Sequence, residues 1–133
     1  CLFKDTMQLN AYSKNNFSLG MEAMLTNEGL VDYLVDKINK KYDLSKKSVG
    51  ILGMSFKAES DDIRNSLSYK LKKVLSFHAK KVLTTDPFVK NDKELKSLNF
   101  VIKNCNILII ATPHKIYKKV KTKKIIVNIW SDF

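Results

Sequence analysis

Residues 50–66, with the sequence GILGMSFKAESDDIRNS, hold the residue types best suited to chemistry in this chain. An apolar run leads into a glycine turn, and a lysine, two adjacent acids and an arginine follow. Arg64 is the only arginine among the 24 basic residues. A guanidinium binds phosphate or carboxylate through two parallel hydrogen bonds, which an ammonium cannot reproduce. The segment therefore predicts recognition of an anionic group, with the alternative that Arg64 is an ordinary surface residue.

The acids of this segment have two interpretations. Asp61 and Asp62 can face a ligand, or they can stabilise the start of a helix, where acids and a Ser or Asn cap are common. In the second case Arg64 pairs with one of them. Gly53 would let the backbone approach a ligand closely, and Lys57 would add a point charge suited to phosphate. The glycine spacing alone is a weak signal, because the three-glycine dinucleotide fingerprint is incomplete.

Apolar patterns predict the elements that must position these residues. Helical periodicity over residues 17–42 predicts one long helix, whose apolar stripe needs a partner to cover it. Residues 1–16 are expected to be a loop. From residue 45 onward we expect strands at 48–52, 81–85, 106–111 and 124–129, and helices at 66–77, 93–103 and 114–120.

Strands separated by helices imply right-handed crossovers and a parallel sheet. The predicted fold class is therefore α/β, with a long N-terminal helix followed by a doubly wound, Rossmann-like parallel sheet. Ligands of such sheets bind beyond the carboxyl ends of the strands, where the strand order reverses. We expect the loops at 53–57 and 112–114 to meet there. His114 is expected to be a loop or helix-start residue, with a catalytic role as the less favoured alternative.

Charge and composition narrow the range of partners. The net charge of +11 favours an anionic partner, but the lysines are scattered and lack the aromatic interleaving that stacks bases, which disfavours nucleic acid. No apolar run reaches the roughly 18 residues that span a bilayer, so no membrane partner is expected. Cys1 and Cys105 have no metal-ligand spacing, so no metal is expected. Few cysteines and no visible export signal favour a reducing, cytoplasmic setting.

The segment at 50–66 resembles the opening of the C-terminal domain in the UDP-glucose/GDP-mannose dehydrogenase family, which carries a pattern close to G-L-x-F-K-x-x-T-D-D-x-R-x-S. The matching positions are Gly53, Phe56, Lys57, Asp61, Asp62, Arg64 and Ser66. Two further stretches are similar to the family, TTDPFV at 84–89 and ILIIATPHKIY at 107–117. The first five residues, CLFKD, resemble its active-site C-L-P-K-D. The resemblance thus covers nearly the whole chain.

Members of this family oxidise the C6 alcohol of a nucleotide-diphosphate sugar to a carboxylate with two NAD⁺ per turnover. The first hydride transfer gives an aldehyde, to which a cysteine thiolate adds. A second hydride transfer then gives a thioester that water hydrolyses. The resemblance implies that Cys1 is this nucleophile and that Asp5 helps to position or activate the water.

The resemblance also implies roles in binding. Lys4 and Arg64 match positions near the NAD cofactor, whereas Phe56 and Lys57 match positions that contact the nucleotide sugar. Near the end, Asn128 and Trp130 stand where many members have an Asp-x-Arg pattern. This departure puts a basic contact to the substrate in doubt.

The implied organisation has three parts: residues 1–16 as a remnant of the active-site loop, 17–44 as part of the central dimerisation helix, and 45–133 as the nucleotide-sugar (UDP)-binding domain. The family's N-terminal NAD-binding domain is missing and the chain does not begin with Met, so we expect a C-terminal fragment that is inactive alone. Expected partners are a UDP-sugar or GDP-sugar and a second copy, giving a homodimer through the long helix. The alternatives are a non-catalytic nucleotide- or nucleic-acid-binding basic module and a purely structural dimerisation fragment.

Overall fold

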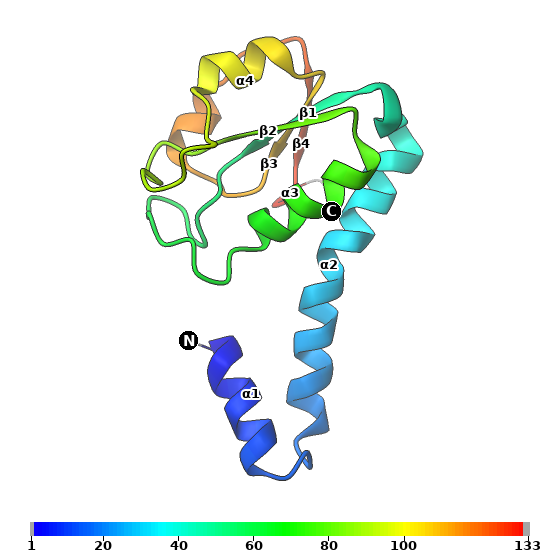
Figure 1. The fold of residues 1–133 in the computed structure, drawn as a ribbon, viewed down its shortest axis with the longest axis vertical. Helices are drawn as coiled ribbons and strands as arrows, with labels where there is room; N and C mark the ends of the chain where they lie inside the picture. Colours follow the sequence, from blue (N-terminus) through cyan, green and yellow to red (C-terminus); the bar gives the residue numbers. More distant parts are fainter. Residues whose placement is uncertain (1, 132–133) are drawn as a thin grey trace.

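The computed structural model describes residues 2–131, with side chains from residue 4 onward. Helices α1 (Leu2–Tyr12) and α2 (Ser18–Tyr42) lie side by side as a hairpin that projects from an α/β unit (Figure 1). The long helix is confirmed, but the loop expected over residues 1–16 is wrong, because most of that segment is helical. The described side chains of α1 are exposed or half-buried, so no core-facing stripe marks this helix in the sequence.

The C-terminal half of α2 anchors the hairpin to the α/β unit. Its buried side chains, Val31, Leu34, Val35 and Ile38, recur at the three- and four-residue spacing of one helix face. They pack against helix α3 (Leu67–His78) and the sheet. A left-handed Asp43 ends α2, and the short 3₁₀ helix η1 (Leu44–Lys46) leads into the first strand. The apolar stripe of α2 is therefore covered within this chain over its second half.

Four short strands form one parallel sheet in the order β2-β1-β3-β4. They are β1 (Ser48–Leu52), β2 (Lys81–Thr85), β3 (Ile107–Ile110) and β4 (Ile125–Asn128). All four predicted strands are confirmed within two residues at each end. Leu52 lies opposite Thr85 on one side and Ile110 on the other, so three carboxyl ends align at one edge.

Helices cover both faces of the sheet (Figure 1). On one face, α2 and α3 pack over Val49 and Ile51, and on the other, helix α4 (Leu98–Asn104) and the 3₁₀ helix η2 (Lys115–Lys119) pack over Leu52. This alternation is what a doubly wound sheet requires, and it confirms the predicted fold class. The helix expected at 93–103 begins only at 98. The strand order reverses between β1 and β3.

Across residues 2–131, the structure contains no helix that is long and apolar enough to cross a membrane.

Candidate functional site

The loops that follow β1, β2 and β3 meet at the carboxyl edge of the sheet. Gly53 has a φ of 96°, and a Cβ there would lie 2.4 Å from the Thr112 Cβ. Only glycine fits so close an approach in this backbone region. The Gly53 N–H bonds the Thr85 carbonyl at 2.9 Å, and the Thr112 hydroxyl donates to the Ser55 carbonyl at 2.7 Å. The predicted meeting of the 53–57 and 112–114 loops is confirmed.

A buried carboxylate, Asp86, joins these loops. Its Oδ2 accepts the backbone N–H groups of Met54 at 2.7 Å and Ser55 at 3.0 Å. Its Oδ1 accepts those of Phe88 at 2.8 Å and Val89 at 3.2 Å. Burial alone would raise the pKa of Asp86, but these N–H groups and the neighbouring imidazole outweigh burial and hold the pKa below its ordinary value. Asp86 is therefore a charged anchor for two loops.

His114 is buried beside this carboxylate. Its Nε2 lies 3.1 Å from the Asp86 Oδ2 and 3.3 Å from the Ser55 Oγ. Its ring packs against Phe88 and Tyr117, with centroids 4.9 and 5.4 Å apart. A Ser-His-Asp triad needs the serine and the aspartate on different ring nitrogens. Here the same nitrogen faces both, so the arrangement does not support a catalytic role for His114.

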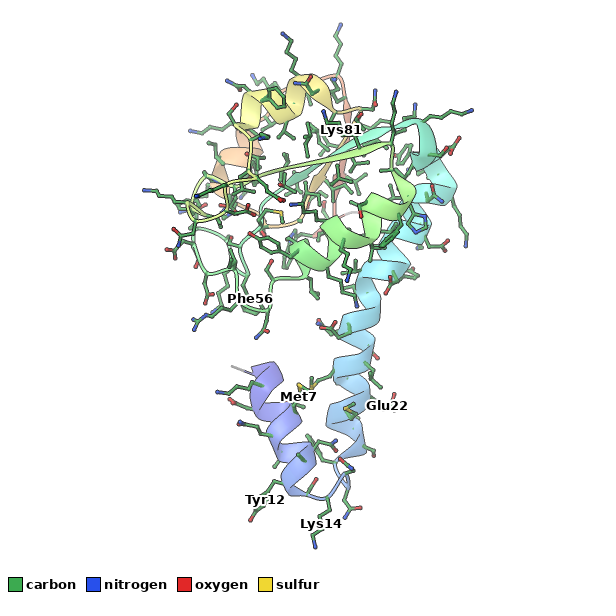
Figure 2. All side chains as sticks on the ribbon, in the orientation of Figure 1. Met7, Tyr12, Lys14, Glu22, Phe56 and Lys81 are labelled. Atoms are coloured by element: carbon green, nitrogen blue, oxygen red, sulfur yellow. The ribbon has the colours of Figure 1, made fainter. Side chains whose placement is uncertain are left out.

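Phe56 and Lys57 lie at the tip of the β1–α3 loop, which comprises residues 53–66. Phe56 is 38% exposed and lies at the edge of the α/β unit that faces the hairpin (Figure 2). Lys57 is exposed, and among residues 4–131 no partner accepts a hydrogen bond from its ammonium. A free ammonium of this kind can bind an anionic group from solution.

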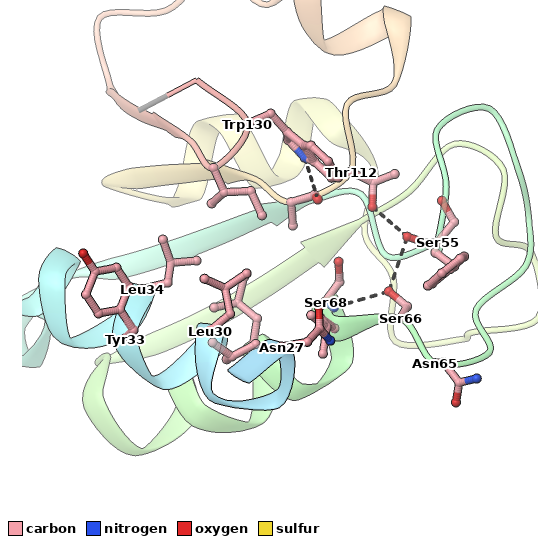
Figure 3. Close-up of a pocket in the computed structure, with 16 residues that line it drawn as sticks. Asn27, Leu30, Tyr33, Leu34, Ser55, Asn65, Ser66, Ser68, Thr112 and Trp130 are labelled. Carbon is pink, nitrogen blue, oxygen red and sulfur yellow. Dashed lines mark hydrogen bonds between the residues drawn. The ribbon is translucent and has the colours of Figure 1, made fainter. Parts of the chain in front are cut away.

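Beside Phe56 lies a cleft of about 430 Å³, bounded by α2, the start of α3 and the segment after β4 (Figure 3). None of its 16 lining residues is charged. Trp130 forms one wall, and its indole N–H donates to the Ala111 carbonyl at 3.0 Å. The Ser68 side chain also lines the cleft. The volume suits a small ligand, and the lining suits an uncharged part of one.

Arg64 forms a bidentate pair with Asp62. Its Nε lies 2.9 Å from Oδ1 and its Nη2 lies 2.7 Å from Oδ2. Hydrogen bonds from Arg64 hold the pKa of Asp62 well below its ordinary value. Ser66, not an acid, caps α3, because its hydroxyl accepts the Ser68 N–H. Of the two open interpretations, the structure therefore supports an internal pair for Arg64.

The remaining predicted site residues lie in the hairpin or outside the described part. Lys4 and Asp5 are exposed on the first turns of α1. No hydrogen bond or ion pair between described residues joins them to the β1–α3 loop. Cys1 lies outside the described residues. The two NAD candidates, Lys4 and Arg64, thus sit on different elements, and among the described residues no hydrogen bond or ion pair joins them.

Sequence reasoning missed the buried network of Asp86 and His114. One signal for it was present: Asp86 stands between a buried strand and a proline, where an aspartate often bonds the backbone of a turn. Nothing local indicated that its second oxygen reaches the loop after β1, more than thirty residues earlier in the chain.

Comparison with known proteins identifies the family whose sequences resemble this chain. The profile described as "UDP-glucose/GDP-mannose dehydrogenase family, UDP binding domain" matches residues 50–132. A UDP-N-acetyl-D-mannosamine dehydrogenase of Pyrococcus horikoshii is 32% identical over 132 residues, which cover 94% of this chain and 31% of the relative. A UDP-glucose 6-dehydrogenase of Rickettsia bellii is 33% identical over 138 residues, covering 100% of this chain and 30% of the relative. The chain thus spans about a third of the length of these relatives.

Solved structures agree on the fold. The UDP-D-ManNAc dehydrogenase of Pyrococcus horikoshii superposes with a TM-score of 0.81 at 25% identity, over 99% of this chain and 38% of that one. The GDP-mannose dehydrogenase of Pseudomonas aeruginosa gives a TM-score of 0.79 at 22% identity, over 97% of this chain and 35% of that one, and shows the fold alone. Taken with the profile match over the sheet and its loops, these findings show that the chain belongs to the UDP-glucose/GDP-mannose dehydrogenase family and contains its UDP-binding domain.

Proposed function

We propose that this chain supplies the nucleotide-sugar-binding part of an NAD-dependent nucleotide-sugar 6-dehydrogenase. The observation that carries the proposal is the loop tip at Phe56 and Lys57. The exposed Phe56 lines an uncharged cleft, and the next residue carries an ammonium that has no hydrogen-bond partner among residues 4–131. The tip lies at the carboxyl edge of a parallel sheet, where ligands of such folds bind. The names of the relatives support the same class of substrate.

In this proposal the two halves of a nucleotide sugar meet different surfaces. The Lys57 ammonium binds the diphosphate, since it is the free cation at the loop tip. The Phe56 ring packs against an uncharged portion of the substrate at the mouth of the cleft. Trp130 stands where the family resemblance implies a basic residue, and it leaves that wall of the cleft without a cation.

The oxidation itself requires more than the described residues supply. In the proposed parent enzyme, a C6 alcohol is converted to a carboxylate, and two NAD⁺ would each accept one hydride. Cys1 would be the thiolate that adds to the aldehyde to form a thiohemiacetal, which becomes a thioester once the second hydride has left, and Asp5 would orient the water that hydrolyses this thioester. Because the matching profile is that of the UDP-binding domain and the chain spans about a third of its relatives, we expect the chain alone to be inactive, with Arg64 as one edge of a cofactor site completed elsewhere.

Titration of the chain with UDP tests the binding role. We predict that UDP shifts the NMR signals of Phe56, Lys57 and Thr112, and that Lys57→Gln weakens binding about tenfold or more, the loss typical of one charge-assisted hydrogen bond. Lys73→Gln is the matched control, because Lys73 is exposed on the outer side of α3 and its replacement removes the same charge. Equal losses in both variants, or salt-sensitive binding to mixed oligonucleotides without UDP binding, would favour a non-specific basic module.

A further inference from the structure

The far side of the loop tip is fixed at Glu59. This residue has a φ of 58°, a left-handed conformation that is uncommon for non-glycine residues. Two contacts hold it there. The Glu59 N–H donates to the His114 Nδ1 at 2.9 Å, and the Glu59 Oε1 accepts the Lys115 N–H at 2.9 Å. Both partners stand at the start of η2, which follows β3, so this segment holds the conformation of the loop after β1.

The hydrogen bonds around His114 define where its ring proton lies. Nδ1 accepts the Glu59 N–H, so it carries no proton. Nε2 faces the carboxylate of Asp86, which can only accept, so Nε2 carries the proton. The Ser55 hydroxyl, also near Nε2, donates its own proton to the Lys57 carbonyl at 2.8 Å and remains free to accept. When the His114 ring is neutral with its proton on Nε2, each hydrogen-bond donor in this network faces an acceptor.

The network holds the loop on both sides of its tip. Asp86 binds the N–H groups of Met54 and Ser55 before the tip, and His114 binds the N–H of Glu59 after it. Between these anchors lie only residues 56–58, of which the first two are the proposed ligand contacts. A contact residue held in its binding conformation loses less entropy when the ligand binds.

We propose that His114 is a positioning residue: its Nε2–H form bridges the Asp86 carboxylate and the Glu59 amide, and so holds Phe56 and Lys57 ready for the nucleotide. The identity of that ligand rests on the proposed function. The bridge itself does not, because it is defined by contacts that exist without ligand. The ring need not touch the substrate, from which its burial separates it.

Two substitutions of His114 test its hydrogen bonds to Asp86 and to Glu59 separately. In His114→Asn, the amide oxygen takes the place of Nδ1 and keeps an acceptor for the Glu59 N–H. In His114→Gln, the amide nitrogen takes the place of Nε2 and keeps a donor to Asp86, but the acceptor for Glu59 is lost. Both variants remove the packing of the ring on Phe88 and Tyr117, so each serves as the packing control for the other.

Three measurements on the 133-residue chain test the bridge. First, the ¹⁵N shifts of the His114 ring report which nitrogen is protonated, and we expect the Nε2–H form. Second, we expect the Glu59 amide to exchange with solvent roughly tenfold faster in His114→Gln than in His114→Asn, as the loss of one hydrogen bond predicts. Third, we expect His114→Gln to weaken UDP binding several-fold more than His114→Asn.

The outcomes distinguish this inference from the proposed function. If the wild-type chain does not bind UDP but Glu59 exchange differs between the variants, the bridge stands and the ligand assignment fails. If UDP binds but both variants lose the same affinity and the same Glu59 protection, His114 only fills space and the bridge is wrong. An Nδ1–H ring in the wild type would also overturn it.

Discussion

Asp86 accepts four backbone N–H groups from two loops, and its charge is compensated by those dipoles rather than by a basic side chain. Arg64, the conspicuous arginine, instead directs its hydrogen bonds to Asp62 at the surface, where such pairs contribute little to stability. Asp86, rather than the more conspicuous Arg64, is therefore the charged residue that holds the loops of the site together.

Replacing Asp86 by Asn should lower the free energy of unfolding by about 1–3 kcal/mol, because the amide NH₂ would face backbone donors and leave a buried group unsatisfied. Asp36→Asn is the control, since within the described part of the chain Asp36 forms only an exposed pair with Lys40, and its replacement should cost no more than about 1 kcal/mol. Urea denaturation of both variants at neutral pH measures the difference. Equal effects would mean that the Asp86 network does not stabilise the fold.

The same carboxylate predicts a pH dependence. The pKa of Asp86 is lower in the folded state than its ordinary value, so its stabilisation is complete above the ordinary aspartate pKa of about 3.9 and is lost as the pH falls through the folded-state pKa. The stability gap between wild type and Asp86→Asn should therefore narrow in acid. A gap that is constant or widens from neutral pH to pH of about 3 would contradict this assignment.

The sequence alone named the exposed candidates for the site but not the buried network beneath them. Phe56 and Lys57 lie in a contiguous motif with recognisable spacing, so a local pattern was enough to propose them. Asp86 and His114 acquire their roles from contacts across 28 or more positions, which no local pattern reports. The pair of Arg64 with Asp62 spans only two positions, but the residue types alone left two interpretations open until the geometry selected one.

At the level of elements, two glycines illustrate opposite requirements. Gly53 ends β1 with a positive φ and abuts Thr112, whereas Gly29 lies in α2 with nothing within 4 Å of the position that a Cβ would occupy. We predict that Gly53→Ala destabilises the chain by more than about 1 kcal/mol through the backbone conformation alone. Gly29→Ala should stabilise it by about 0.5–1 kcal/mol, because alanine favours a helix interior. Thermal unfolding of the pair checks both signs, and a shared sign would contradict the prediction.

Helices and strands were predicted accurately from the sequence where their apolar side chains are buried. The strands and the second half of α2 were predictable because their apolar side chains enter a core. Helix α1 was missed because its described side chains stay exposed or half-buried, so helix and loop give the same polar pattern there. The helix expected from residue 93 starts later because Ser97 provides its cap, accepting the Phe100 N–H at 3.4 Å.

On the scale of the molecule, the hairpin leaves apolar surface exposed. Leu19 and Leu25 on the first half of α2 are 77% and 52% exposed, and Met7 on α1 is 55% exposed. The α/β unit does not cover this half of the helix (Figure 1). The exposure of these apolar side chains supports the homodimer expected through the long helix, in which a second copy would bury them.

We predict that the chain sediments as a dimer and that Leu25→Lys weakens the dimer about tenfold or more, the cost of losing one buried leucine. Phe77→Lys is the control, because Phe77 is 79% exposed on α3 and lies outside the hairpin. A monomeric wild type, or equal weakening by both substitutions, would contradict dimerisation through α2.

The strand order also determines when the sheet can form during synthesis of the chain. β1 is the first strand made, yet it lies between β2 and β3 and gains its second neighbour only when residues 107–110 exist. Thr112 and His114, which shape the loop after β1, come later still. The hairpin is built from local contacts, whereas the sheet and its site depend on distant ones, which form more slowly. During synthesis the proposed dimerisation surface can therefore be complete while the nucleotide-binding edge still awaits the last quarter of the chain.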